Sequence, residues 1–280
     1  MGRGDAWRLA RAAAERSGVT LRSLGGLEDA QLVSRIIDRV WGGEAMPPSL
    51  LRAFQHAGGT FYGAEAEGEL VGFVLGFLGW SEGVHMHSHM LAVVPERESR
   101  GAGYALKLAQ RADCLERGVE EVRWTYDPLV ARNARFNLTR LGAVATAFLP
   151  GFYGEMPDRL NRGDRSDRFE VRWRLTSPRV ESLLGGDAGV HPVAGTSLLE
   201  LEGPSAVPQP VETGAAVDAP VLVGVPHDFQ ALRALDPELG ARWRDASARA
   251  FASCFAAGLV ATWIGPQGRY VFTDPGNGPA

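Results

Sequence analysis

The stretch LAVVPERESRGAGYALKLAQ at residues 91–110 is the strongest indication of how this chain folds. An apolar run ends at Pro95, and a helical pattern begins directly after Arg100-Gly101-Ala102-Gly103. Glycines in such a turn let the backbone approach a ligand closely, and the first turn of a helix offers unpaired N–H groups at the positive end of its dipole. The stretch therefore predicts a strand, a glycine loop and a helix that can together bind a phosphate or pyrophosphate.

The glycine spacing alone does not distinguish a phosphate site from a helix-initiating turn. Gly101-x-Gly103 lacks the third glycine of a dinucleotide fingerprint and the Gly-Lys-Ser/Thr of a P-loop. The order of the surrounding elements carries more information.

Helical and β patterns alternate on both sides of this loop. Apolar residues at helical spacing predict helices at 27–42, 47–57, 102–117 and 131–142. Between residues 60 and 95, β-rich runs separated by Glu-Gly turns predict a three-strand antiparallel meander. Further strands are predicted at 18–24, 120–127, 143–149 and 169–175.

The composition changes after Thr176. Residues 185–220 are rich in Gly, Pro, Ala and Ser and predict an irregular connector, followed by a strand at 220–226, a helix that begins at Asp236 and a hairpin. The apolar face of that helix is consistent with packing on the sheet or on a second subunit of a homodimer. We divide the chain into an N-terminal segment 1–17, a main domain 18–175, a connector 176–219 and an extension 220–280.

The composition excludes several classes of function. A formal charge of −4, from 29 Lys and Arg against 33 Asp and Glu with no block of one sign, disfavours nucleic acids and anionic membranes as partners. No apolar run reaches a membrane span or a signal core, which predicts a cytoplasmic protein. Arg outnumbers Lys so strongly, with Lys107 the single lysine, that we expect a G+C-rich bacterial origin. Cys114 and Cys254 are predicted to be buried thiols.

The element order and the central motif resemble the GNAT superfamily of acyl-CoA-dependent N-acyltransferases over about residues 18–175. The motif comprises Leu91, Val93 and Pro95 on the strand, the loop at 100–103, and Tyr104-Ala105-Leu106 at the start of the helix. The resemblance implies an α+β fold with a central mixed, mostly antiparallel sheet flanked by helices. The C-terminal residues then form a small α/β extension.

The resemblance also implies a CoA site. Backbone N–H groups from about Glu98 to Tyr104 would bind the pyrophosphate, and the pantetheine arm would lie between splayed strands at 85–94 and 121–127. A backbone N–H near Ala92 would polarise the thioester carbonyl. One departure is Glu98, which stands where the family usually has Gln or Arg. The implied CoA-binding residues are Leu91, Ala92, Val93, Glu98, Ser99, Arg100, Gly101, Ala102, Gly103, Tyr104, Asn133, Phe136 and Asn137.

The general acid that many relatives carry is not at its usual place. Leu138 stands three residues before Leu141-Gly142-Ala143, where those relatives have a Tyr that protonates the departing thiolate. Tyr126 and Tyr153 are alternative acids, and CoA thiolate is a tolerable leaving group without one. Asp127, after the second splayed strand, is a candidate for recognising an amino group.

His85, His87 and His89 alternate along one predicted strand, so that all three point to the same face. Side chains in a line on a straight strand do not converge on one ion, so we predict no metal. Histidine has a pKa suited to taking the proton from an ammonium group. His89 and His87 lie two and four residues before Leu91-Ala92-Val93, where another member of the superfamily has histidines that serve in proton removal. They are the predicted catalytic residues, with Tyr126 as the candidate acid.

We therefore expect an N-acyltransferase that moves an acyl group from acetyl-CoA, or another acyl-CoA such as succinyl-CoA, to the primary amine of a small molecule such as an amino acid. Two alternatives stay open. One is a non-catalytic CoA- or ligand-binding module, favoured by Leu138 and Glu98, and the other is acetylation of protein N-termini or lysines.

Overall fold

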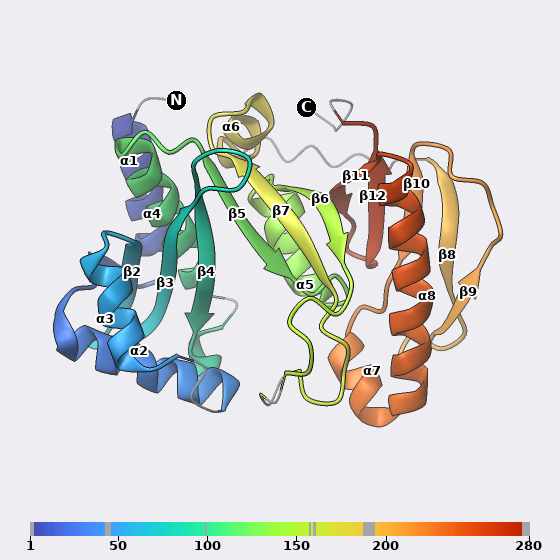
Figure 1. Cartoon of the computed structure of the whole chain (residues 1–280), viewed down its shortest axis with the longest axis horizontal. Coiled ribbons are helices and arrows are strands. Elements are labelled where there is room, and N and C mark those ends of the chain that lie inside the picture. Colours follow the sequence, from blue (N-terminus) through green and yellow to red (C-terminus); the bar gives the residue numbers. More distant parts are fainter. Residues whose placement is uncertain are drawn as a thin grey trace. The chain divides into compact units, whose positions relative to one another are not determined.

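The computed structural model describes residues 3–42, 46–98, 100–156, 158, 161–186 and 194–275. The chain forms two compact units, described one at a time (Figure 1). The first comprises Met1–Trp124 and Pro157–Arg162, and the second comprises Thr125–Met156 and Gly163–Ala280. The predicted boundary at residue 175 marks the end of the resemblance to a family. A division of the chain into compact units does not test such a boundary, so it stays a prediction.

The sheet of the first unit contains the predicted meander. Its strand order is β1-β2-β3-β4, followed by the first part of β5, and all neighbours except β4 and β5 are antiparallel. The turn between β2 and β3 consists of Glu67 and Gly68, whose φ angles of 54° and 82° match the twist of a tight hairpin. The strands are β1 (Thr20–Ser23), β2 (Thr60–Ala66), β3 (Glu69–Gly79), β4 (His85–Val93) and β5 (Glu121–Tyr126).

Helices cover both faces of this sheet. On one face α4 (Ala102–Glu116) packs against β2, β3 and β4, and α1 (Arg3–Arg16) lies along α4. These two helices approach closely because the facing side chains are small, including Ala6, Ala10 and Ala109, all of them buried. The other face carries α2 (Gly26–Trp41) and α3 (Pro48–His56).

In the second unit, β6 and β7 of the predicted main domain are continuous with strands of the extension. The strand order is β7-β6-β11-β12-β10-β8-β9, and β11 joins β6 through the pair Ala261–Ala145. The β11–β12 hairpin and β10 confirm the predicted extension strands. The strands are β6 (Val144–Leu149), β7 (Arg168–Arg174), β8 (Thr196–Glu202), β9 (Gln209–Glu212), β10 (Val221–Gly224), β11 (Val260–Ile264) and β12 (Arg269–Thr273).

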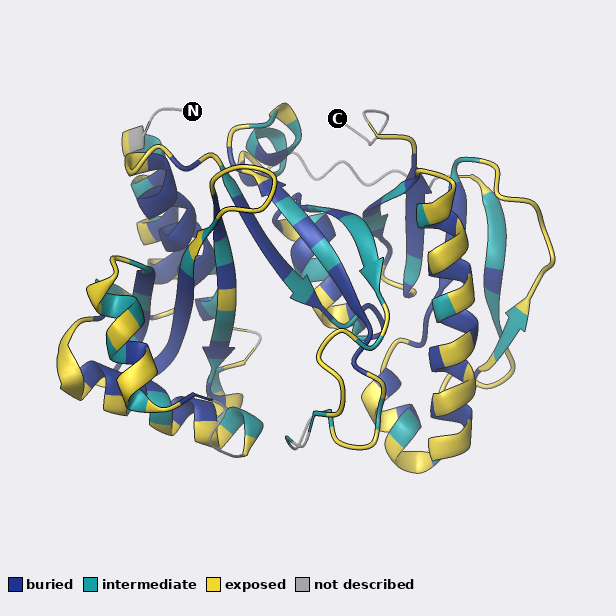
Figure 2. Cartoon of the chain, viewed as in Figure 1, coloured by how far each residue is buried: buried dark blue, intermediate teal, exposed yellow. Residues whose placement is uncertain are grey.

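Helix α8 (Pro237–Ala256) packs on this sheet through an aromatic core. It begins at Asp236, whose side chain accepts a hydrogen bond of 2.9 Å from the N–H of Leu239, as the sequence predicted. Phe251 lies against Phe169 of β7 with ring centroids 4.6 Å apart. Figure 2 shows the buried side of α8 turned to the strands. Of the two arrangements predicted for the apolar face, the structure has the one within the chain.

A buried ion network ties α8 to the segment after β5. Arg244, 3% exposed, donates two hydrogen bonds of 2.8 Å to the carboxylate of Asp127 and also bonds Asp164. Arg233 of α7 (Phe229–Leu235) lies 2.9 Å from the same Asp164. The carboxylate of Asp127 therefore has a cationic partner inside the protein, which argues against its predicted role in recognising an acceptor.

Three features differ from the sequence predictions. The N-terminal segment forms α1, whose pattern is masked because its buried face is alanine. The connector, predicted to be irregular, contains α6 (Pro178–Leu184) and the strands β8 and β9. Strand β9 was not predicted because it contains Pro210, which argues against a strand in the sequence. An edge strand, however, accommodates a proline. Helix α7 was also missed, because it is only seven residues long.

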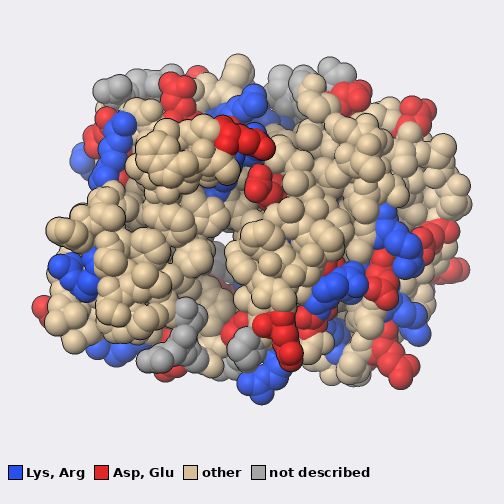
Figure 3. Space-filling view, viewed as in Figure 1, with Lys and Arg blue, Asp and Glu red and all other residues tan. Residues whose placement is uncertain are grey.

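The surface and the cysteines agree with the composition. On the face shown in Figure 3, acidic and basic side chains are interspersed. None of the helices in the described part of the chain combines the length and apolarity that a membrane span needs. Cys114 and Cys254 are free and buried, as predicted.

Replacing Arg244 with Met should destabilise the protein by about 2–4 kcal/mol, because two half-buried carboxylates then lose the buried guanidinium that bonds both of them. The matched control is Arg249→Met, which breaks an exposed pair with Glu212 and should cost less than about 1 kcal/mol. Urea unfolding of both variants measures the difference, and equal losses would contradict a dominant role for the network.

Candidate functional site

The centre of the site is an irregularity in β4. Its pairing with β3 runs Leu75↔Met90 and then Gly76↔Ser88, so that His89 is an extra residue on the β4 side. Such a bulge bends a strand locally and re-aims its side chains, and bulges are frequent beside active sites. The bulge therefore places His89 at a bend of the strand.

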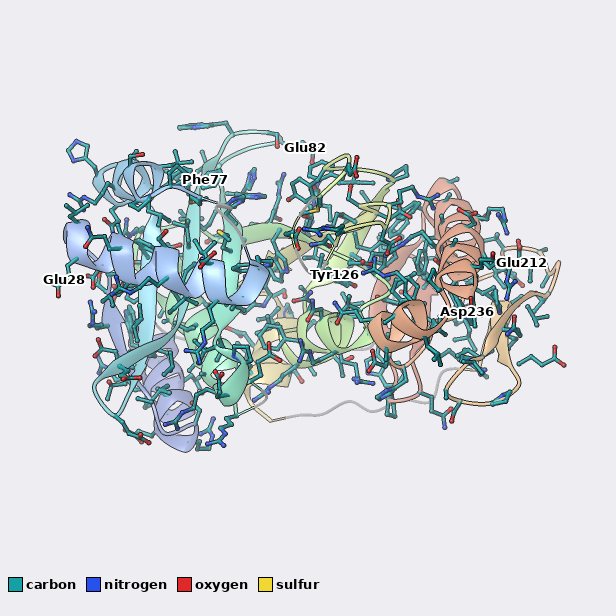
Figure 4. All side chains as sticks on the ribbon, turned by 90° about the horizontal axis from the view of Figure 1, so that it is seen from below. Glu28, Phe77, Glu82, Tyr126, Glu212 and Asp236 are labelled. Carbon is teal, nitrogen blue, oxygen red and sulfur yellow. The ribbon has the colours of Figure 1, made fainter. Side chains whose placement is uncertain are left out.

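His87 and His89 point to the same face of the sheet, as predicted. Their ring centroids lie 6.0 Å apart, and both rings contact Phe77 of β3, at 5.2 Å and 5.7 Å (Figure 4). Phe54 of α3 stacks on the same Phe77 at 4.8 Å. His85 is buried further along the strand, with Nδ1 3.0 Å from the carbonyl oxygen of Gly83. The working pair is thus His87 and His89, set on an aromatic wall.

Both histidines are held in the neutral form that accepts a proton. Desolvation, with His89, His85 and Lys107 adding positive charge, lowers the pKa of His87 to about 4. Desolvation also lowers the pKa of His89, without a contribution from those charges. His87 is half-buried and its pKa is lowered more strongly, whereas the side chain of His89 is exposed. His89 is therefore the better proton acceptor of the two.

One edge of β4 is unpaired beyond the histidines. Within the first unit, β4 pairs with β5 only at Met86↔Val122 and His87↔Arg123. Val94 donates to the carbonyl oxygen of Val71 on β3. Because bonding alternates along an antiparallel ladder, the N–H of Ala92 also points to β3, whereas those of Leu91 and Val93 point away from it. The N–H groups near Ala92 that point away from β3 are thus those of Leu91 and Val93, and their role in polarising a carbonyl stays a prediction.

The glycine loop has the predicted conformation at the start of α4. Gly101 precedes the helix with φ of +101°, a conformation that favours glycine. Ala102 and Gly103 form the first helical turn, whose N–H groups have no acceptor within the helix.

The predicted range of donors is too wide at both ends. Glu98 donates its N–H to the carbonyl of Pro95 at 3.2 Å, and Tyr104 donates to that of Gly101 at 3.0 Å. Arg100 is exposed, and Ser99 lies outside the described residues. The available donors therefore centre on residues 101–103.

Helix α1 ends against this loop. A Cβ atom placed on Gly101 would lie 3.2 Å from Cβ of Ser17, whereas one on Gly103 would make only ordinary contacts with Val93 and Leu91. The N-terminal helix therefore restricts the residue at Gly101 in addition to its backbone conformation.

The other predicted CoA contacts belong to the second unit. They lie on α5 (Ala131–Ala134) and on the π-helical turn η2 (Arg135–Arg140) that continues it. Asn133 is exposed, Phe136 is half-buried and Asn137 is buried. Leu138, at the place of the usual Tyr, is completely buried and packs in the core.

The two tyrosines proposed as acids have different environments in the second unit. Tyr126 is buried, with its hydroxyl 3.4 Å from that of Tyr270, and Tyr270 donates to the carbonyl of Pro128 at 2.7 Å (Figure 4). Desolvation raises the pKa of Tyr126. Tyr153 is 44% exposed and its hydroxyl lies 3.1 Å from Oγ1 of Thr125. The burial of Tyr126 argues against its acting as the acid, and its catalytic role stays a prediction.

Sequence reasoning missed the residues behind the histidines. Lys107 of α4 lies on the opposite face of the sheet, bonded to Ser88. The sequence marked Lys107 in one way only: it is the single lysine among the 29 Lys and Arg residues of the chain. Among the described residues, no group of three or more His, Cys, Asp or Glu side chains is arranged to hold a metal ion.

Comparison with known proteins gives a family match for part of the chain. Residues 30–142 match the Acetyltransferase (GNAT) family. No curated protein matches the sequence. Similar solved structures include Ard1 from Thermoplasma volcanium, at 22% identity and a TM-score of 0.44, covering 55% of this chain and 96% of that one. Another is the ribosomal-protein-S18-alanine N-acetyltransferase from Escherichia coli, at 16% identity and a TM-score of 0.47, covering 57% and 95%.

The family match includes the meander, the bulge with both histidines, the glycine loop and the helical segment formed by α5 and η2. The chain therefore carries a domain of the acetyltransferase (GNAT) family over residues 30–142, and a further C-terminal region extends beyond it.

Proposed function

We propose that this protein is an N-acetyltransferase that moves the acetyl group of acetyl-CoA to the primary amine of a small molecule. The observation that carries the proposal is the pair of neutral histidines on β4, directly before the unpaired part of that strand. The same strand leads through a short turn to Gly101 and the first turn of α4. Proton acceptor, strand edge and phosphate loop therefore follow one another over residues 87–103.

The donor is positioned by backbone groups. The N–H groups at residues 101–103, at the positive end of α4, bind the pyrophosphate of acetyl-CoA. The outward N–H groups of Leu91 and Val93 bind the acyl end and polarise its carbonyl. Glu98 weakens this site little, because its side chain is exposed while the donors are backbone groups.

The chemical step is a direct attack. An amine reaches the site as ammonium and loses a proton to His89, directly or through water. Its nitrogen then forms a bond to the thioester carbon while the carbon–sulfur bond breaks, and the electron pair leaves with the thiolate of CoA. Cys114 takes no part, since desolvation raises its pKa to about 12 and keeps it a thiol.

The wall around the histidines favours an amine carried on an apolar group. Phe77 and Phe54 line it, and among the described residues no carboxylate raises the pKa of either histidine. Without an acidic partner to hold an ammonium ion, the neutral amine is the form the wall accommodates best. The amine of an amino acid with an apolar side chain fits this description.

The proposal is tested in two stages. A ligand that binds only the folded state at 100 times its dissociation constant stabilises it by about 2.7 kcal/mol, so that acetyl-CoA, succinyl-CoA and free CoA are compared by melting temperature. Thiol release from the stabilising acyl-CoA is then followed with apolar amines, amino acids and peptides with free N-termini. Release only with peptides would favour protein acetylation. Stabilisation without release would favour the non-catalytic module.

Replacing Gly101 with Ala should abolish the stabilisation by acetyl-CoA, since the variant strains a positive φ and moves the loop against Ser17. The control is Gly118→Ala at the other end of α4. That glycine also has a positive φ, of 73°, but its side faces open space. Both variants should be less stable than the wild type, and only Gly101→Ala should lose the binding of acetyl-CoA. Retained binding in Gly101→Ala would contradict the placement of the donor.

Replacing His89 with Ala should lower kcat by about a hundredfold or more while the dissociation constant of acetyl-CoA stays within about twofold. In the wild type, kcat should fall as the pH is lowered, with a midpoint below 6.5. Desolvation lowers the pKa of His89, and only the neutral imidazole can accept the proton. The control is His227→Ala, an exposed histidine of the second unit. Parallel losses of rate and acetyl-CoA binding would mean that His89 has a structural role.

A further inference from the structure

Lys107 is a buried cation whose hydrogen-bond partners, among the residues that the structure describes, are uncharged. It lies in the middle of α4 with 2% of its surface exposed. Its Nζ donates to Oγ of Ser88 at 2.7 Å and to Oε1 of Gln110 at 3.2 Å, and it lies 3.8 Å from the centre of the Trp124 ring. A buried ammonium group normally requires an acidic partner, so that its presence here calls for an explanation beyond packing.

The contacts of Lys107 connect three strands of the first unit. Ser88 is on β4, Trp124 is on β5, and Gln110 passes the network on to Oγ1 of Thr60 on β2, at 3.0 Å. Across from Ser88, Gly76 leaves room for this network. A Cβ there would lie 2.7 Å from both Nε2 of Gln110 and Oγ1 of Thr60. The sheet is therefore shaped around these polar side chains.

The bond to Ser88 is made at the bulge. Ser88 stands between His87 and His89, and its side chain points to α4 while theirs point to Phe77. Ser88 pairs with Gly76 at the register shift whose extra residue is His89. Lys107 thus bonds, from the α4 side of the sheet, to the strand segment that orients the rings of His87 and His89.

Lysine suits this position better than arginine. Its ammonium group is compact, is carried on a flexible stem and loses its proton when desolvated, whereas arginine stays charged. Desolvation lowers the pKa of Lys107 to about 7. All remaining basic residues of the chain, counting Lys and Arg, are arginines.

We propose that Lys107 is a positioning residue for the histidine pair: its bond to Ser88 fixes the bulge that carries His89, and its positive charge lies behind the strand segment that carries His87. The effect on rate rests on the function proposed above, whereas the effect on the titration of His87 does not. The groups around His87 are His85 and His89 on its own strand, Phe77 on β3, Lys107 through the sheet, and Arg123, its register partner on β5, which is paired with Glu121.

Two variants separate the bond from the charge. Lys107→Met removes both and leaves a side chain of similar length, a change that buried cations often tolerate. Ser88→Ala removes the bond and keeps the charge. The imidazole signals of His87 and His89 are titrated by NMR in each variant, with assignments from His87→Gln and His89→Gln.

In Lys107→Met the pKa of His87 should rise above about 4 but stay below its ordinary 6.5, because one of the charges that disfavour its protonation is gone while desolvation, the largest cause of the lowering, remains. Lys107 is itself protonated over that range, below its own pKa of about 7, so that the wild type carries the full charge there. In Ser88→Ala the pKa of His87 should stay low. An unchanged His87 titration in folded Lys107→Met would overturn the role of the charge.

Both variants should lower kcat about tenfold to a hundredfold while the affinity for acetyl-CoA stays within about twofold, as misplacement of a reacting group does. If Lys107→Met fails to fold, Ser88→Ala decides the role of the bond, and an unchanged kcat in it would overturn that role. If the wild type turns over none of the tested acceptors, the proposed function fails, and the histidine titrations still test the electrostatic part of the inference.

Discussion

Strand β4 is bonded along its length to β3 but to β5, within the first unit, only at Met86 and His87. This unequal pairing is the constraint on which the candidate site depends. A strand with one free edge keeps backbone N–H groups available to a ligand, and those of Leu91 and Val93 point to that edge. A strand bonded on one side only also needs support from its faces. Phe77 supplies it on one face, and Lys107 with Ser88 supplies it on the other.

Helix α4 links the two ends of the site. Its first turn, after Gly101, presents the N–H groups that suit a pyrophosphate, and one turn further on it carries Lys107 beneath the bulge. A rigid helix keeps these two positions at a constant separation. A ligand at the loop and a proton acceptor at His89 are therefore held in register by one element, supported from behind by α1.

Much of the fold could be predicted because its signals are local. The meander shows alternation and tight turns, and α8 begins with Asp236 followed by Pro237. Period-two spacing predicted that His85, His87 and His89 share one face, and the choice of His87 and His89 among them came from the family resemblance. The bulge was not, because inserting one residue into a ladder leaves no trace in composition. The burial of Lys107 was hidden for a related reason: a lysine within a helical pattern is expected at the surface.

Contacts over long sequence separations were also beyond prediction. Arg244 and Asp127 are 117 residues apart, and nothing in either local sequence indicates the pair. The addition of β11 to β6 belongs to the same class, since it depends on where a hairpin near the end of the chain docks. Function was predictable to the level of the family because the motif around Gly101 is compact, whereas the acceptor depends on residues gathered from several elements.

The continuation of the sheet from β6 into β11 bears on how this protein is divided for expression or fusion. A fragment cut after β7 would expose the β6 edge that Ala261 occupies, and an uncovered strand edge is a template for pairing between molecules. The same cut would remove Arg244 and leave Asp127 with Arg168, at 4.0 Å, as its nearest cation. A fragment that ends after β7 therefore lacks partners that β6 and Asp127 have in the whole chain.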